Sequence, residues 1–422
     1  MANRREFLLK GSVIILICLS ALLASADAYQ IEKTEAINDS VNGLKAAEAF
    51  IQNAIENGKL AGFSALVLKD NQEVFRLAKG YSEIEKKIPI KKNTIFRIYS
   101  MTKPITAVAL MTLYDEGKFK LDDKVSKYIP EFANIKVYTP QENGFRLEEQ
   151  ENEMTIRHLL THTSGISYGW DPNSYVDSLY RVINVSGRDA KLEDKMLALA
   201  KLPLNFQPGT KWMYGLSIDV AGYLVEVLSG MPFDKFLQER LFTPLKMVDT
   251  GFYVPEEKHD RLCGLYNKRR KQPLQLSKGG MADVFKMPAI NFSGGGGLVS
   301  TIDDYARFCQ MLLNKGELEG LRILQPETAQ LIMSNQLPEN TEFNMSNQLP
   351  VSAQVEEGKM GFGLAGAVDL ETGEYSWGGL ASTNFWINPT NKTIIITCTQ
   401  ILPSNYSYGI KFKKMVESAF SK

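Results

Sequence analysis

Ser100 and Lys103 are the residues of this sequence whose types and spacing first suggest chemistry. They are followed by an almost wholly apolar run, residues 105–114, and then by Gly117. Such a run predicts a buried helix with Gly117 at its C-terminal cap. Pro104 is tolerated only in the first turn of a helix, where the amide hydrogens lack partners in any case. The pattern therefore places Ser100 at the N-terminus of the helix, with Lys103 one turn further on.

A serine and a lysine on one helix face can act as a nucleophile and its base. Side chains at i and i+3 share a face, and a serine hydroxyl attacks only once a base removes its proton. Burial and the positive end of the helix both favour the neutral form of a lysine. The backbone amide of Ser100 can also stabilise an oxyanion. The S-x-x-K spacing is common by chance, so a surface lysine one turn after a serine cap is the alternative on this segment alone.

Two further segments favour the catalytic interpretation. One ends in Tyr214-Gly215 and precedes a helical run at residues 218–228; the other contains Trp377-Gly378-Gly379-Leu380. At this point the chain resembles the serine β-lactamase and penicillin-binding-protein superfamily, and within it the class C β-lactamase-related esterases. Segments 159–166 and 294–301 also match the habits of that family. The resemblance covers about residue 45 to the C-terminus, and its motifs are specific jointly rather than singly.

The resemblance implies a role for each matching residue. Ser100 and Lys103 match the nucleophile and base, and Tyr214 matches the tyrosine that deprotonates the serine or relays its proton to the leaving group. Trp377, Gly378 and Gly379 match a third motif, on a sheet edge that lines the cleft. The amide of Leu380 would join that of Ser100 as the oxyanion hole. The mechanism implied is an acyl-enzyme without metal or cofactor.

Two departures from the β-lactamase pattern bear on the substrate. The second motif there is Tyr-x-Asn, whereas here it is Tyr214-Gly215-Leu216. The third motif there begins with Lys, whereas here it begins with Trp377. An indole in place of a cation favours uncharged, apolar or aromatic groups. We therefore expect a carboxylesterase on small uncharged esters. The alternatives are a β-lactamase or a D-amino-acid peptidase or amide hydrolase of the same family, and, in another class, a non-catalytic penicillin- or cell-wall-binding protein.

A second hydrolase motif fails its structural context. Residues 165–169 match G-x-S-x-G, which requires a strand before the serine and a helix after it. The preceding residues 154–161 read as helical, so the motif is interpreted as a loop, with Tyr168 lining the cleft.

The histidines and the glycine run are interpreted as structural. His158 and His162 stand four apart, but no Glu follows the first and no other ligand type clusters nearby, so no metal site is expected. His162 is expected to bond within its loop. The run at residues 293–297 lacks the ending of a phosphate-binding loop. It is interpreted as a tight turn that leads to a helix capped at residues 300–304.

The order of elements predicts an α/β fold. An antiparallel sheet built from both chain ends, with flanking helices, is joined to a mostly helical subdomain. Strand-like runs at residues 62–68 and 73–81 form a predicted hairpin, and further strands are expected near 374–378, 384–388 and 393–399. Within a hydrolase domain at 29–422, the sheet part is about 40–98 and 290–422, and the helical part is about 99–289.

The N-terminus and the composition concern location and partners. Residues 1–28 have the layout of a signal peptide, with Arg4-Arg5 typical of the twin-arginine type. The predicted location is periplasmic or secreted, without stable membrane insertion after cleavage. Lys plus Arg and Asp plus Glu both total 48, so no nucleic-acid partner is expected. The expected partner is a small-molecule ester or amide.

Three cysteines, Cys263, Cys309 and Cys398, remain after cleavage and are expected to be buried thiols, although a single disulfide among them stays an alternative. The oligomeric state cannot be read from the sequence.

Overall fold

The computed structural model describes residues 43–184, 187–338, 340–345 and 359–420. The predicted signal peptide lies outside the described residues. The chain divides into two compact units. In the smaller unit, helical residues 43–53 lie against the C-terminal part of helix α10 (Ser407–Phe420), where a Cβ on Gly43 would fall 2.5 Å from that of Ala419. The larger unit, residues 54–409, carries the sheet and all the predicted site residues.

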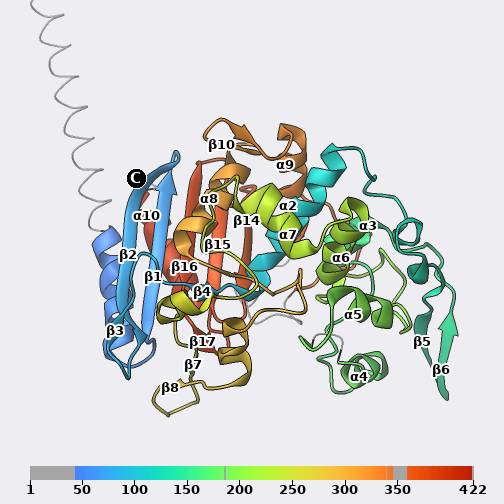
Figure 1. The fold of residues 1–422 in the computed structure, drawn as a ribbon, viewed down its shortest axis with the longest axis horizontal. Coiled ribbons are helices and arrows are strands. Elements are labelled where there is room, and N and C mark those ends of the chain that lie inside the picture. The colour runs from blue at the N-terminus through green and yellow to red at the C-terminus, as the bar shows by residue number, and fades with distance from the viewer. Residues whose placement is uncertain (1–42, 185–186, 339, 346–358, 421–422) are drawn as a thin grey trace, which may run out of the picture. The chain divides into compact units, whose positions relative to one another are not determined.

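The described part of the larger unit contains an eight-stranded antiparallel sheet built from both ends of the chain. Its order is β12-β13-β14-β15-β16-β1-β2-β3 (Figure 1). The strands in that order are Met360–Phe362, Ala367–Asp369, Tyr375–Gly379, Thr383–Asn388, Thr393–Cys398, Gly62–Lys69, Gln72–Glu83 and Ile88–Pro89. The N-terminal strand β1 pairs with the C-terminal strand β16, which confirms the predicted architecture.

The predicted hairpin of β1 and β2, and the opposite faces of Phe385 and Trp386 in β15, follow from local sequence. Asp70 and Asn71 turn the chain with φ of 50° and 64°, a conformation that Asp and Asn tolerate better than most residues. In β15, Phe385 is fully buried whereas its neighbour Trp386 is partly exposed, as the alternating faces of a strand require.

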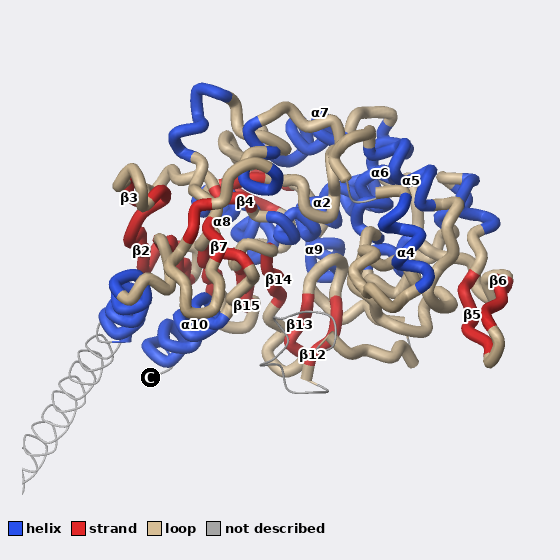
Figure 2. Tube along the Cα trace, turned by 90° about the horizontal axis from the view of Figure 1, so that it is seen from below, coloured by secondary structure: helices blue, strands red, loops and turns tan. Residues whose placement is uncertain are grey.

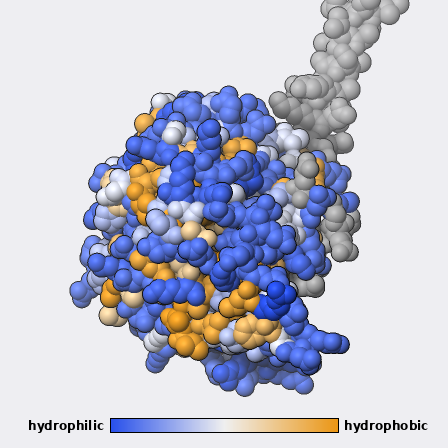
Figure 3. All heavy atoms as spheres, turned by 90° about the vertical axis from the view of Figure 1, so that its right-hand side faces the viewer, coloured by the Kyte–Doolittle hydropathy of each residue, from blue (hydrophilic) through white to orange (hydrophobic). Residues whose placement is uncertain are grey.

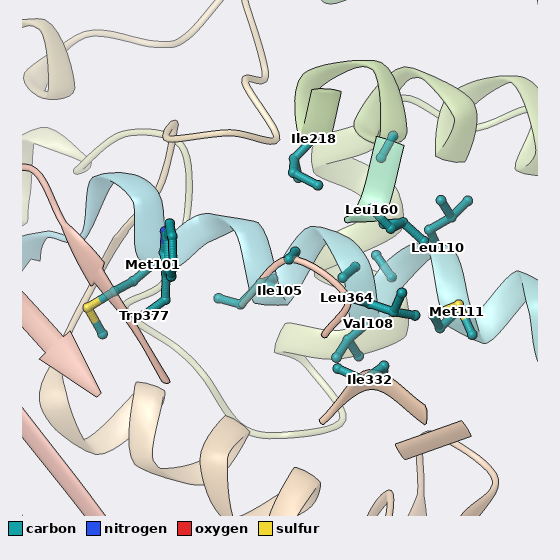
Figure 4. Close-up of a cluster of buried hydrophobic side chains, with 14 of the residues drawn as sticks. Met101, Ile105, Val108, Leu110, Met111, Leu160, Ile218, Ile332, Leu364 and Trp377 are labelled. Atoms are coloured by element: carbon teal, nitrogen blue, oxygen red, sulfur yellow. The ribbon is translucent and has the colours of Figure 1, made fainter. Parts of the chain in front are cut away.

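Helix α2 (Thr102–Asp115) lies at the centre of the core. Residues 102–113 are all buried, and Gly117 follows the helix with φ of 72°, in agreement with its predicted place at the cap. Figure 4 shows α2 side chains packed against Leu160, Ile218 and Ile332. In Figures 1 and 2, α2 lies between the sheet and the helices α5 and α6. A helix that is apolar all round must be buried in this way.

The other helices fall in two groups. Those of the helical part are α3 (Ile156–Leu160), α4 (Tyr175–Val182), α5 (Leu192–Leu199), α6 (Ser217–Ser229) and α7 (Phe233–Leu237). Helix α8 (Ile302–Leu313) contacts β1, β15 and β16, and α9 (Pro326–Ile332) contacts α2. Thr301 caps α8 by accepting from the backbone amide of Asp304, which confirms the helix predicted after the glycine run.

Short strands occupy several loops, some of them within the part expected to be helical. They are β4 (Phe96–Arg97) with β9 (Val299–Ser300), β5 (Val137–Gln141) with β6 (Gly144–Glu148), β7 (Tyr266–Asn267) with β8 (Gln275–Leu276) and β17 (Ile401–Leu402), and β10 (Glu317–Leu318) with β11 (Leu321–Arg322). The hairpin of β5 and β6 was not predicted. It is only partly buried, so its sequence lacks a clear apolar alternation.

The side of the molecule that carries β5, β6 and α4 is mostly hydrophilic, with apolar areas between the polar ones (Figure 3). Among the described residues no helix is both long and apolar enough to cross a membrane. Cys263, Cys309 and Cys398 are all buried and free, which confirms their interpretation as buried thiols and removes the disulfide alternative.

Candidate active site

Ser100 lies in a single 3₁₀ turn, Tyr99–Met101, directly before α2. Tyr99 adopts a φ of 42° there, a conformation that costs a bulky residue energy and is held only by its surroundings. Tyr305 donates from its hydroxyl to the carbonyl of Met101 at 2.9 Å. Ser100 is partly exposed, whereas Tyr99 and Met101 on either side of it are buried.

The third predicted motif lies beside this turn. Strand β14 contacts the turn, and a Cβ on Gly379 would fall 2.2 Å from the carbonyl oxygen of Ile98. Only glycine fits so close an approach. Leu380 follows Gly379 directly.

Lys103 is fully buried at the first turn of α2. Its Nζ donates to the carbonyl of Gly295 at 2.6 Å and to the hydroxyl of Tyr168 at 2.8 Å. Burial lowers the pKa of Lys103 to about 7, against a smaller opposing effect of the Asp219 carboxylate. An amine with that pKa is largely neutral above neutral pH and can accept a proton.

Tyr214 is distant from Ser100 in the sequence, and its side chain lies beside that of Ser100 in the fold. Its hydroxyl accepts from the indole N–H of Trp377 at 3.4 Å and interacts with the side chains of Ser100 and Tyr168. Burial raises the pKa of Tyr214 above its usual value, and the hydrogen bond with Ser100 is the largest effect in the opposite direction. Sequence reasoning placed these groups far apart in the chain, and the fold brings them together.

Local packing fixes where Tyr214 points. The amide of Met213 donates to the carbonyl of His162 at 2.8 Å. A Cβ on Gly215 would fall 2.0 Å from the carbonyl oxygen of Ile166. The second motif is thus pressed against the loop at residues 162–168, which explains why glycine follows Tyr214.

That loop is the G-x-S-x-G segment, and its serine is structural. The Ser167 hydroxyl is buried and donates to the carboxylate of Asp177. Helix α3 precedes the loop in place of the strand that a nucleophile elbow requires. The loop carries Tyr168 to Lys103, and the Tyr168 ring stacks on Trp170 at a centroid separation of 4.4 Å.

Trp377 lies against Tyr214 and is largely buried, with 9% of it exposed. Its indole N–H donates to the hydroxyl of Tyr214 at 3.4 Å, and Figure 4 shows it beside Met101 at the start of α2. The indole therefore contributes to the position of Tyr214. Trp170 is 61% exposed and was missed, although it stands two residues after Tyr168.

The sequence analysis missed Asp219, which lies against the glycine run that it interpreted as a tight turn. Asp219 is buried in the first turn of α6. Its Oδ1 accepts from the hydroxyl of Ser293 and from the amide of Gly295 at 3.1 Å, whereas Oδ2 has no partner among the described groups. Burial raises the pKa of Asp219, against the opposing hydrogen bond of Ser293 and the charge of Lys103. A Cβ on Gly295 would lie 2.3 Å from Oδ2, so this glycine is part of the site.

The two histidines of segment 154–163 have different surroundings. His158 closes the cap of α3, where its ring nitrogen Nδ1 accepts from the amide of Thr155 at 3.2 Å. The expectation that His162 bonds within its loop is wrong for the side chain. Its ring is fully buried beside Trp212 and Tyr214, and neither ring nitrogen has a partner within the described part of the chain. No cluster of metal-ligating side chains occurs among the described residues.

Comparison with known proteins identifies the relatives of this chain. The family model described as Beta-lactamase matches residues 47–418. Protein Rv1367c of Mycobacterium tuberculosis is 31% identical over 370 residues, which cover 84% of this chain and 90% of that protein. Esterase EstB of Burkholderia gladioli is 31% identical over 298 residues, 66% of this chain and 72% of that protein.

Solved structures share the fold. The structure of EstCE1, described as a hydrolase with promiscuous acyltransferase activity, superposes with a TM-score of 0.75 at 23% identity. The match covers 92% of this chain and 100% of that one.

Proposed function

The chain belongs to the β-lactamase family of serine hydrolases, and we propose that it is a carboxylesterase that cleaves small uncharged esters through an acyl-enzyme. The observation that carries the proposal is the interaction between the side chains of Ser100 and Tyr214, with the amine of Lys103 4.5 Å from the centroid of the Tyr214 ring. A hydroxyl, a phenol and a neutral amine in one cluster supply a nucleophile and its proton acceptors.

The reaction begins with the attack of the Ser100 hydroxyl on the ester carbonyl carbon. The serine proton passes toward Tyr214, and the negative charge that develops on the carbonyl oxygen is held by the amides of Ser100 and Leu380. Removal of one such donor typically costs about 10² to 10³ in rate. The tetrahedral species then collapses, the alcohol leaves with a proton, and water releases the acid from Ser100 by the same steps.

The proposed substrate class follows from the groups that surround the site. Tyr168, Trp170 and Trp377 place aromatic rings around Tyr214. Two buried charged groups close to the site, Lys103 and Asp219, are each already engaged with Gly295. Such a site favours an uncharged ester. The description of EstB as an esterase supports the same choice.

The decisive experiment compares ester and β-lactam turnover. We expect the purified protein to hydrolyse p-nitrophenyl acetate and butyrate, and to turn over nitrocefin far more slowly. Ser100→Ala should be inactive, whereas Ser167→Ala, which alters the other candidate nucleophile, should keep most of the activity. Equal ester hydrolysis by the parent and Ser100→Ala proteins would refute the proposal, and faster nitrocefin turnover would favour a β-lactamase.

Acyl transfer is a second candidate function. The description of EstCE1 combines a hydrolase with acyltransferase activity, and an alcohol can replace water as the acceptor of the same acyl-enzyme. The test is to add methanol or butanol to the p-nitrophenyl butyrate reaction. Formation of the corresponding butyrate ester, absent in Ser100→Ala, would establish transfer. Release of butyric acid alone would leave hydrolysis as the sole activity.

A further inference from the structure

We propose that Tyr168 is a proton-relay residue, so that the path between nucleophile and base contains two phenols in series. The proton leaves Ser100 for the hydroxyl of Tyr214. It then passes to Tyr168 and ends on the amine of Lys103. The inference deepens the proposed function and rests on it.

The hydrogen bonds of the site connect the groups in this order. The Tyr214 hydroxyl interacts with the side chains of Ser100 and Tyr168, and its ring centroid lies 5.2 Å from that of Tyr168. Tyr168 is hydrogen-bonded to Lys103 at 2.8 Å. Every hydroxyl in the series can both donate and accept, so one chain of hydrogen bonds joins the nucleophile to the amine.

A direct route from the serine to the lysine is not formed. Within the described part of the chain, the hydrogen bonds of Lys103 Nζ go to Gly295 and Tyr168, and none goes to Ser100. Toward Tyr214, the amine lies over the ring, 4.5 Å from the centroid. The contact with Tyr214 is therefore one with the aromatic face, and the phenol of Tyr168 is the hydroxyl that the amine reaches.

The neutral amine of Lys103 has the hydrogen-bond donors and the acceptor lone pair that this role requires. A neutral lysine amine carries two N–H donors and one lone pair. The carbonyl of Gly295 can only accept, so it takes an N–H of Lys103. In the structure the amine also donates to the hydroxyl of Tyr168. A turn about the Cε–Nζ bond brings the lone pair to that hydroxyl, which can then donate to it and pass on a proton.

The transfer balances without any further reactant. The Ser100 Oγ–H bond breaks as Oγ bonds to the acyl carbon, and each phenol gives up its own proton as it receives another. The result is an ammonium at Lys103 and two unchanged phenols. When the ester C–O bond breaks, the proton returns along the same path and protonates the departing alkoxide.

The surroundings hold Tyr168 and receive the charge. The ring of Tyr168 is fixed by its stack on Trp170, with an interplanar angle of 12°. The Tyr168 hydroxyl and the Asp219 carboxylate both border Gly295. A Cβ added to this glycine would lie 3.0 Å from Oη of Tyr168 and 2.3 Å from Oδ2 of Asp219. The buried carboxylate thus lies on the lysine side of the relay, where it stabilises the ammonium that forms.

The test is Tyr168→Phe, which removes the hydroxyl and keeps the stacked ring. We expect kcat for p-nitrophenyl butyrate to fall on the order of 10²-fold, the usual contribution of a positioned acid–base group, with KM nearly unchanged. Tyr180→Phe is the matched control. Tyr180 is also a buried tyrosine, its hydroxyl donates to the carbonyl of Pro203 at 3.4 Å, and we expect its loss to leave kcat unchanged.

The rate in mixtures of H₂O and D₂O separates a relay from a structural role. Several protons in flight give the parent a curved dependence of kcat on the deuterium fraction, and Tyr168→Phe should lose that curvature. A linear dependence in the parent, or a kcat within about threefold of the parent in Tyr168→Phe, would overturn the relay. Either result leaves the esterase proposal standing if Ser100→Ala is inactive, and an active Ser100→Ala would refute the esterase proposal itself.

Discussion

Replacement of Lys103 by methionine should change how the stability of the protein depends on pH. Burial lowers the pKa of this lysine from 10.5 to about 7. The unfolded chain therefore binds a proton at Lys103 at any pH below 10.5, whereas the folded chain binds it only below about 7. Between these values the proton favours the unfolded state, and the free energy of unfolding rises with pH.

The size of the effect follows from the shift. At roughly 1.4 kcal/mol for each pKa unit, the buried amine costs the folded state about 4 kcal/mol at pH 7 and about 1 kcal/mol at pH 10. Lys103→Met has no proton to bind. The stability that the variant gains over the parent, measured as its larger free energy of unfolding, should thus be about 3 kcal/mol greater at pH 7 than at pH 10. The lost hydrogen bond to Gly295 lowers the stability of the variant equally at both pH values.

Urea-induced unfolding of the parent and of Lys103→Met at the two pH values measures this difference. All other titrating groups are shared by the two proteins and cancel in the comparison. Lys118→Met, which removes an exposed lysine, is the control and should show no such dependence. A difference between the parent and Lys103→Met that is equal at both pH values, within about 0.5 kcal/mol, would refute the buried neutral amine.

Three further predictions concern the same cluster. The charge of Asp219 raises the pKa of Lys103. Asp219→Asn should therefore move the acid limb of the kcat/KM profile, expected near pH 7 in the parent, to lower pH. An unmoved limb in the pH–rate profile would exclude this coupling. Trp377→Phe removes the indole donor to Tyr214 and should lower kcat up to about tenfold, as expected for one neutral hydrogen bond, and an unchanged kcat would show that this bond is not used. Gly295→Ala places a Cβ 2.3 Å from a carboxylate oxygen, so thermal unfolding should show a loss of about 1–3 kcal/mol together with lower kcat; a parent-like melting curve would contradict the packing.

The sequence by itself determined the local elements and the chemistry of the main groups. The apolar run after Ser100 could only be a buried helix, and its register fixes Lys103 one turn from the serine. The polar pair Asp70-Asn71 between two strand-like runs determined the hairpin of β1 and β2. These features are set by neighbours within a few residues, which is the range over which periodicity and turn preferences act.

Only the tertiary structure decided which groups meet. The sequence gives no distance between Tyr168 and Lys103, which are 65 positions apart yet hydrogen-bonded. Nor does it show that Trp377 faces Tyr214, because a strand has two faces and packing selects one. The same holds for Asp219 and the glycine run. A carboxylate on a buried helix and a glycine-rich turn each have ordinary structural explanations alone, and their close approach beneath Lys103 is set by contacts between distant segments.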